Sequence, residues 1–186
     1  FTVFLVSLPL AYNYLVPTQL INYAKSILSA TFFSSNIFFY FTNTQYGAEN
    51  SLFQPFLHTW SLGVEEQFYI FFPILILIFY RFAKNHLITI LTVLILVSVL
   101  YSNWMISQNL QFNFFMIFTR FWELGLGSLL AFYELKYGRI KHELLKQIIP
   151  PIGLSLITWS IIFSSPKFLT ILPVVGTVLI ILYSNK

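Results

Sequence analysis

The chain has 186 residues, of which 58% are hydrophobic and only 9% are charged, with a net charge of +4 and a mean hydropathy of +0.78. Soluble domains carry about 25% charged residues, so this composition excludes an ordinary soluble domain and predicts an all-α, polytopic transmembrane helix bundle. The absence of cysteine excludes disulfides, zinc–thiolate sites and cysteine nucleophiles.

Seven apolar segments come close to the roughly 20 residues that a membrane-spanning helix needs. They are residues 1–16, 24–41, 60–80, 87–106, 112–132, 148–163 and 168–183. Pro17 closes the first segment, and Pro150 and Pro151 open the sixth. No linker or repeat divides them, so we expect a single domain, 1–186. Because Phe1 lies in what reads as a helix already under way, we expect a fragment that lacks its N-terminal helices.

Basic residues are distributed unevenly around these segments. If every segment crosses once, eight fall on one side and Lys167 alone falls on the other, with Arg120 inside a segment. The eight are Lys25, Arg81, Lys84, Lys136, Arg139, Lys141, Lys146 and Lys186. Loops rich in basic residues stay in the cytoplasm. The positive net charge is therefore interpreted as a sign of membrane orientation and not of nucleic-acid binding. On this basis residues 42–59 are expected to face outward. A re-entrant second segment would invert every later assignment.

The third segment opens with the polar run HTWSLGVEEQFY, residues 58–69. Helical spacing puts His58, Ser61 and Glu65 on one face, and Glu66 and Tyr69 on the neighbouring one. Carboxylates at this depth are unfavourable unless they line a polar cavity. The alternative is a solvated helix N-terminus, where acids favour the helix dipole and aromatic residues form an interfacial belt.

A second polar cluster contains Arg120 and Glu123, which are spaced to meet on one helix face. A structural ion pair is the alternative interpretation. Glu65, Glu66 and Glu123 oppose Arg120 alone, so either one glutamate is protonated or a cation from outside the chain compensates. Asn36, in the middle of the second segment, either joins helices or contacts substrate. No metal-ligand spacing or phosphate-binding loop occurs.

Three stretches resemble the membrane acyltransferase-3 family in order and spacing. LHTWSLGVEEQFYIFFPILI, residues 57–76, resembles the family signature. ILSATFFSSNIFFYF, residues 27–41, and FTRFWELGLGSLLAF, residues 118–132, resemble the segments before and after it. The resemblance covers residues 1–135, and the remainder only continues a hydrophobic bundle.

The resemblance implies an O-acyltransferase of the bacterial cytoplasmic (inner) membrane, crossing it several times. The donor would be acetyl-CoA or another acyl-CoA, with no bound cofactor. The acceptor would be a hydroxyl of an envelope glycan, such as lipopolysaccharide or peptidoglycan, or its lipid-linked precursor. The family's first helix carries an arginine and a histidine that this chain lacks, so we expect the isolated chain to be inactive. Its expected partners are acyl-CoA, the glycan and membrane lipids.

Within this resemblance Glu65 and Glu66 would support catalysis, by positioning the sugar or orienting the missing histidine. The predicted substrate-binding residues are His58, Trp60, Ser61, Gln67, Tyr69, Arg120, Glu123 and Asn36. A covalent acyl-Ser61 intermediate has no support beyond the hydroxyl. A proton-coupled transporter is the competing function, because buried Glu and Arg also make proton relays. A structural membrane subunit is the third alternative.

Overall fold

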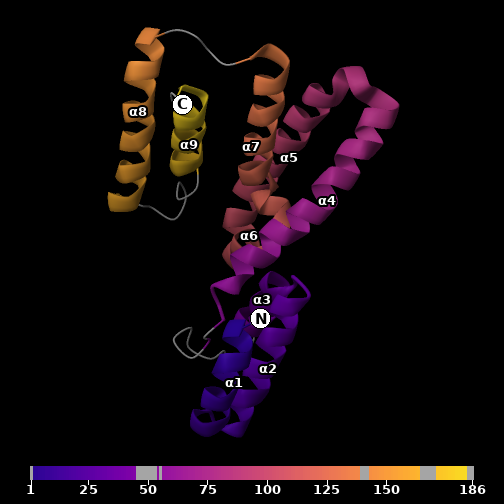
Figure 1. Ribbon diagram of the computed structural model, residues 1–186, viewed down its shortest axis with the longest axis vertical. Coiled ribbons are helices and arrows are strands. Elements are labelled where there is room, and N and C mark those ends of the chain that lie inside the picture. Colours follow the sequence, from indigo (N-terminus) through magenta and orange to yellow (C-terminus); the bar gives the residue numbers. More distant parts are fainter. Residues whose placement is uncertain (1, 45–53, 55, 139–142, 164–170, 184–186) are drawn as a thin grey trace. The chain divides into compact units, whose positions relative to one another are not determined.

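A computed structural model describes residues 2–44, 54, 56–138, 143–163 and 171–183 (Figure 1). Helices make up the secondary structure of these residues, and no strand occurs among them, which confirms the all-α prediction. The helices are α1 (Thr2–Tyr14), α2 (Pro17–Thr31), α3 (Ser35–Thr44), α4 (Thr59–Ala83), the 3₁₀ turn η2 (Lys84–His86), α5 (Leu87–Gln108), α6 (Leu110–Phe115), α7 (Ile117–Tyr137), α8 (Glu143–Ile162) and α9 (Ile171–Tyr183).

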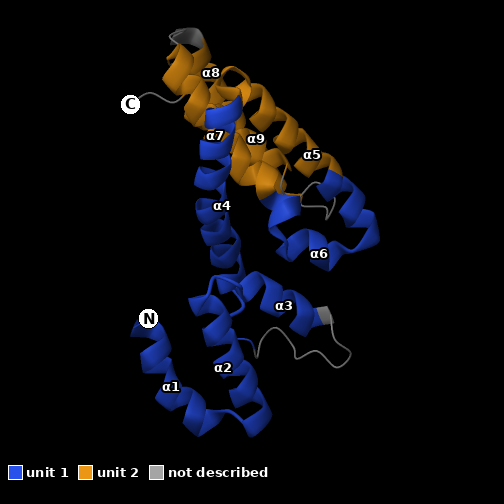
Figure 2. Cartoon of the chain, turned by 90° about the vertical axis from the view of Figure 1, so that its right-hand side faces the viewer, with its two compact units in different colours: residues 1–82, 101–120 blue, residues 83–100, 121–186 orange. Residues whose placement is uncertain are grey.

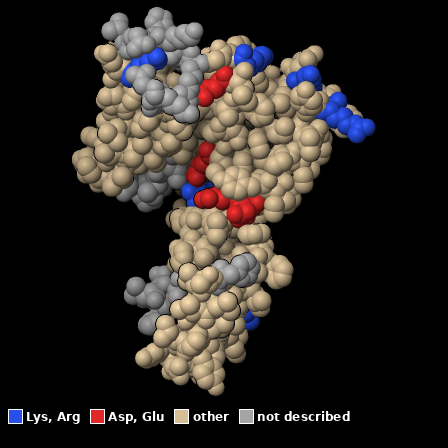
Figure 3. All heavy atoms as spheres, viewed as in Figure 1, with Lys and Arg blue, Asp and Glu red and all other residues tan. Residues whose placement is uncertain are grey.

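Three stretches among the described residues are long and apolar enough to cross a membrane. They are Thr59–Gln108, Leu110–Tyr137 and Leu145–Ile162. Many side chains of α4 beyond its first turns, including those of Phe71 and Leu77, are apolar and yet exposed. Charged residues are sparse on the face drawn in Figure 3. An exposed apolar surface of this extent is suited to lipid, and the chain is a membrane protein.

The predicted second segment, residues 24–41, is not one helix, and this expectation is corrected. α2 ends at Thr31 and α3 starts at Ser35. The backbone N–H of Ser34 donates to Ser29 O (2.8 Å) and that of Phe33 donates to Ala30 O (3.3 Å), which is the Schellman pattern of helix termination. Phe33 has the left-handed φ of 55° that this pattern requires, where glycine is usual.

This break removes the basis of the orientation prediction. α2 has 15 residues and α3 has 10, so neither is long enough to cross the hydrocarbon core as a straight helix. Lys25, expected to follow the first segment, lies inside α2. The assignment of residues 42–59 to the outer face assumes a full crossing by the second segment, and no such single helix exists.

Two other boundaries differ from the prediction. The fifth segment is interrupted at Met116, whose extended backbone (φ −91°, ψ 141°) separates α6 from α7. Pro150 and Pro151 lie in the interior of α8 rather than opening it, because α8 begins at Glu143. Residues 139–142 of the expected basic loop and residues 164–170 around the start of the seventh segment lie outside the described residues.

The chain divides into two compact units (Figure 2). Unit 1 contains residues 1–82 and 101–120, and unit 2 contains residues 83–100 and 121–186. The core of unit 1 is formed by Ala11, Tyr23, Phe39, Phe56 and Phe115. In unit 2 α8 and α9 cross closely at two glycines, Gly153 and Gly176. The single-domain assignment stays a prediction.

Candidate active site

The start of α4 packs directly against the corner between α2 and α3. Ser35, the first residue of α3, is buried and donates its hydroxyl to Thr59 O at 2.7 Å. A Cβ on Gly63 would lie 3.0 Å from Ser35 Oγ and 3.2 Å from Asn36 Oδ1. Glycine at this position therefore lets the backbone of α4 approach the side chains of α3, which a larger residue would prevent.

Asn36 and Gln67 join this corner to two other helices. Asn36 is 1% exposed. Its Nδ2 donates to Phe115 O of α6 (3.1 Å) and weakly to Gln67 Oε1 (3.4 Å). Gln67 Nε2 donates to Asn36 Oδ1 (2.9 Å) and to Phe33 O (2.8 Å). Both amides are thus used in helix packing, as buried polar groups must be. We call Phe33, Ser35, Asn36, Thr59, Gly63 and Gln67 the polar corner.

Aromatic rings hold the guanidinium of Arg120 beside the first turn of α4. Its Cζ lies 4.9 Å from the centre of the Trp60 ring and 5.9 Å from that of Phe114. The two rings pack against each other with centres 4.4 Å apart. Guanidinium groups bind the faces of aromatic rings. The preceding residue, Thr119, is 1% exposed and donates to Met116 O (2.8 Å), which fixes the start of α7.

Glu65 and Glu66 are both partly buried on α4. Within the part of the chain that the structure describes, no hydrogen bond or ion pair engages either carboxylate. With about 100° of rotation per residue, Glu66 lies on the side of α4 that Gly63 presents to the polar corner, whereas Glu65 lies on the opposite side. Two partly buried carboxylates that have no partner among the described residues are costly in so apolar a chain, and the position of Glu66 marks it as the one beside the packed polar groups.

Among the described residues, His58, Ser61 and Tyr69 form no side-chain hydrogen bond to the polar corner. His58 precedes α4 and is exposed, with its ring 6.4 Å from that of Phe56. Ser61 donates its hydroxyl to His58 O at 3.3 Å. Tyr69 is 58% exposed. The structure therefore connects Asn36 with Gln67 through hydrogen bonds, whereas the hydroxyl of Ser61 is used within its own turn of the chain.

Glu123 lies three residues after Arg120, and both belong to the uninterrupted helix α7. This is the helical spacing on which the predicted pair depends. Among the described residues, no group of three or more His, Asp or Glu residues is placed to hold a metal ion.

Three residues that shape this region were not among the predicted site residues: Phe33, Ser35, which was noted only as a polar neighbour of Asn36, and Gly63. Gly63 and Ser35 stand inside the stretches that carried the family resemblance, so their position in those motifs was the available signal. Phe33 lies in the same stretch as Ser35, but nothing in the sequence indicated its positive φ, because an aromatic residue rarely adopts one.

Comparison with known proteins places the chain in a family. It is 33% identical to an uncharacterized protein of Haemophilus influenzae over 174 residues, which cover 84% of this chain and 69% of that protein. The chain belongs to the same family as this Haemophilus protein. No protein-family model matches the chain. No solved structure matches it either.

Two further relatives have a named activity. The chain is 29% identical to the O-acetyltransferase OatA of Staphylococcus aureus over 137 residues, covering 72% of the chain. It is 36% identical to the peptidoglycan O-acetyltransferase OatA of Listeria monocytogenes over 69 residues, or 37% of the chain. The chain spans 22% of the length of the first and 11% of the second. It is therefore a distant homologue of O-acetyltransferases that matches only a part of them.

Proposed function

We propose that the protein containing this chain is a membrane O-acyltransferase of the acyltransferase-3 type. It crosses the bacterial inner membrane several times and moves an acetyl group from acetyl-CoA to a hydroxyl of an envelope glycan or its lipid-linked precursor. The similarity to the OatA proteins supports acyl transfer. Because the Listeria relative is named for peptidoglycan, peptidoglycan is the first acceptor to test, ahead of lipopolysaccharide.

The observation that carries this proposal is the placement of the partly buried Glu66, without a partner among the described residues, beside the polar corner. In the reaction the acceptor oxygen attacks the thioester carbonyl, the carbon–sulfur bond breaks, and the acceptor proton ends on the released thiol. A carboxylate can take part by accepting the proton of the hydroxyl, or by orienting an imidazole that does so. Glu66 stands on a helix that Asn36 and Gln67 hold in place, which suits such a role.

Arg120 complements this carboxylate with a fixed positive charge. Acyl transfer develops negative charge on the carbonyl oxygen, and the CoA donor carries phosphates; a guanidinium can stabilise either. The stacking of Arg120 on Trp60 limits the positions of its side chain. The chain's own residues thus supply a carboxylate and a cation on adjacent elements of unit 1.

The test uses the full-length protein in membranes. Membranes that contain it are incubated with acetyl-labelled CoA, and label is followed into the peptidoglycan and lipopolysaccharide fractions, beside membranes without the protein. Acetyl label on glycan hydroxyls that depends on the protein is the expected result. Coupled uptake or export of a solute with no acetylated product would contradict acyl transfer and support the transporter instead.

A further inference from the structure

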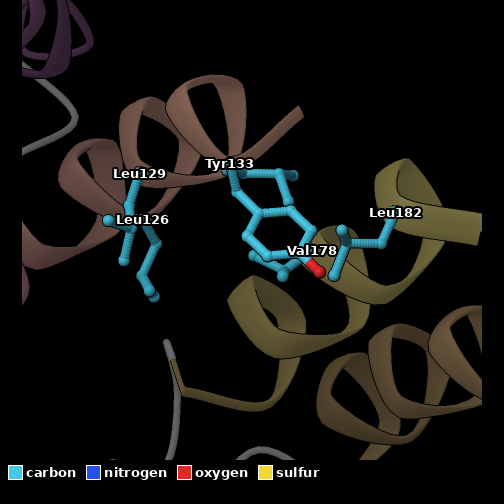
Figure 4. A pocket seen from close by; sticks show the side chains of 6 residues that line it. Leu126, Leu129, Tyr133, Val178 and Leu182 are labelled. Carbon is cyan, nitrogen blue, oxygen red and sulfur yellow. The ribbon is translucent and has the colours of Figure 1, made fainter. Parts of the chain in front are cut away.

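Unit 2 contains an apolar cavity that the proposed reaction does not use. It has a volume of about 270 Å³ and lies between α7 and α9. Figure 4 shows the side chains of α7 on one side of the cavity and those of α9 on the other. The lining residues are Leu126, Leu129, Leu130 and Tyr133 from α7 and Val178 and Leu182 from α9. Only the Tyr133 hydroxyl is polar among these side chains.

The cavity is elongated along α7. From Leu126 to Tyr133 the helix rises about 10 Å, at about 1.5 Å per residue, so the lining residues form an apolar strip that matches a segment of a hydrocarbon chain. Both helices belong to apolar stretches of a membrane protein. The cavity is open along one side, and its apolar lining offers a surface that suits alkyl groups.

The polarity changes abruptly at the Tyr133 end of the strip. The rings of Tyr133 and Tyr137 pack with centres 5.1 Å apart. Lys136, one turn beyond Tyr133, is exposed, and its Nζ lies 5.1 Å from the centre of the Tyr137 ring. Tyrosine and lysine at the end of an apolar helix mark the membrane–water interface, where lysine attracts anionic lipid. The order along α7 is therefore leucine, Tyr133, the partly buried Glu134, which is engaged in an interaction of its own, and then the exposed Lys136.

We propose that this cavity binds one acyl chain of an anionic phospholipid, whose phosphate lies beside Lys136. The leucine strip takes the hydrocarbon, the two tyrosines lie at the level of the ester groups, and the ammonium faces the headgroup. The positive charge at the end of the strip selects an anionic lipid over a zwitterionic one. This site is independent of the acyl-transfer proposal, because its evidence comes from unit 2 alone.

The experiment places the full-length protein in phosphatidylcholine vesicles with a trace of photoactivatable phosphatidylglycerol that carries a diazirine in one acyl chain. A phosphatidylcholine probe with the same chain is the lipid control. Labelled peptides are mapped by mass spectrometry. Val178→Trp fills the cavity, and Ile181→Trp is its matched control, since Ile181 is on the same helix, is 45% exposed and does not line the cavity. Lys136→Gln removes the cation, and Lys84→Gln is its control.

The phosphatidylglycerol probe is expected to label peptides of α7 and α9 more strongly than the control probe. Val178→Trp is expected to abolish that excess while Ile181→Trp retains it. Lys136→Gln is expected to lower it about fivefold, the contribution of one basic residue near an anionic surface. Equal labelling by both probes in the wild type would overturn the proposal. An excess of phosphatidylglycerol labelling that persists in both Val178→Trp and Lys136→Gln would also overturn it.

Discussion

Asn36 and Gln67 hydrogen-bond to each other through both ends of their amide groups. Gln67 Nε2 donates to Asn36 Oδ1 at 2.9 Å, and Asn36 Nδ2 donates to Gln67 Oε1 at 3.4 Å. The two residues lie 31 positions apart, on α3 and α4. Their pairing joins the helix after the strained corner to the helix that carries the paired glutamates, so the position of Glu66 depends on it.

This pairing predicts non-additive effects on stability. Asn36→Leu removes the donor to Phe115 O and to Gln67 Oε1, leaves Gln67 Nε2 with Phe33 O as its acceptor, and is expected to lower the free energy of unfolding by about 1–3 kcal/mol. Gln67→Leu is expected to act similarly. Because both remove the same contact, the double variant is expected to lose less than the sum. Chemical unfolding of the four proteins in detergent measures this, and strictly additive losses would show that the two amides do not depend on each other.

Phe33 adopts a conformation that suits glycine. A left-handed backbone costs a non-glycine residue about 1–2 kcal/mol. Phe33 is 38% exposed, so removing its ring also gives up part of its burial, and the matched comparison is therefore between Phe33→Gly and Phe33→Ala, which both lose the ring. Phe33→Gly is expected to have the higher thermal midpoint of the two in the full-length protein, because only glycine adopts this φ without strain. A higher midpoint for Phe33→Ala would contradict strain at this position.

The crossing of α8 and α9 requires glycine at Gly176. A Cβ there would lie 2.5 Å from Gly153 O, a backbone atom that cannot move alone. Gly176→Ala is therefore expected to lower the free energy of unfolding by about 1–3 kcal/mol. Gly127, in α7, is the matched control, because a Cβ there meets nothing within 4 Å among the described residues. Gly127→Ala is expected to be neutral or slightly stabilising, and equal losses in both variants would contradict the close crossing.

We expect the planar shape of the Arg120 guanidinium, as well as its charge, to contribute to the rate of acetyl transfer. Arg120→Lys keeps the charge but loses the planar group that lies over Trp60, and with it a part of a cation–π contact worth up to about 2 kcal/mol when desolvated. We expect acetyl transfer by the full-length protein to fall by up to about tenfold, with unchanged expression. The label assay measures the rate. A wild-type rate of acetyl transfer in Arg120→Lys would mean that only the positive charge of this residue contributes to the reaction.

The long apolar helices could be predicted because their signal is strong. A run of apolar residues such as that of α5 leaves no alternative to a buried or membrane helix, and α4 and α5 lie within a few residues of the expected bounds. The break between α2 and α3 could not be predicted from the sequence, because it depends on a positive φ at Phe33 and not on a glycine or a proline. The predicted start of the sixth segment at Pro150 and Pro151 was wrong, because both prolines lie inside α8, which starts at Glu143.

Part of the candidate site could also be predicted from the sequence, because its signal is strong. The motif containing Glu65 and Glu66 was visible, because charge in an apolar chain is conspicuous. Helical spacing alone could not tell which glutamate faces the packed corner, since that depends on which side of α4 meets α3. The close approach at Gly63 supplies this information. The role of Asn36 as a helix-joining amide likewise required its partners in α4 and α6.

The most direct test of the central claim compares Glu66→Gln with Glu65→Gln in the full-length protein. Acetyl transfer from labelled CoA to the glycan fraction is measured at matched expression, with His86→Gln, an exposed site outside the polar corner, as control. We predict that Glu66→Gln lowers the rate by about 10²-fold or more, as loss of a general base does, that Glu65→Gln lowers it less, and that His86→Gln leaves it unchanged. A wild-type rate in Glu66→Gln would contradict the claim that the glutamate beside the polar corner takes part in the reaction.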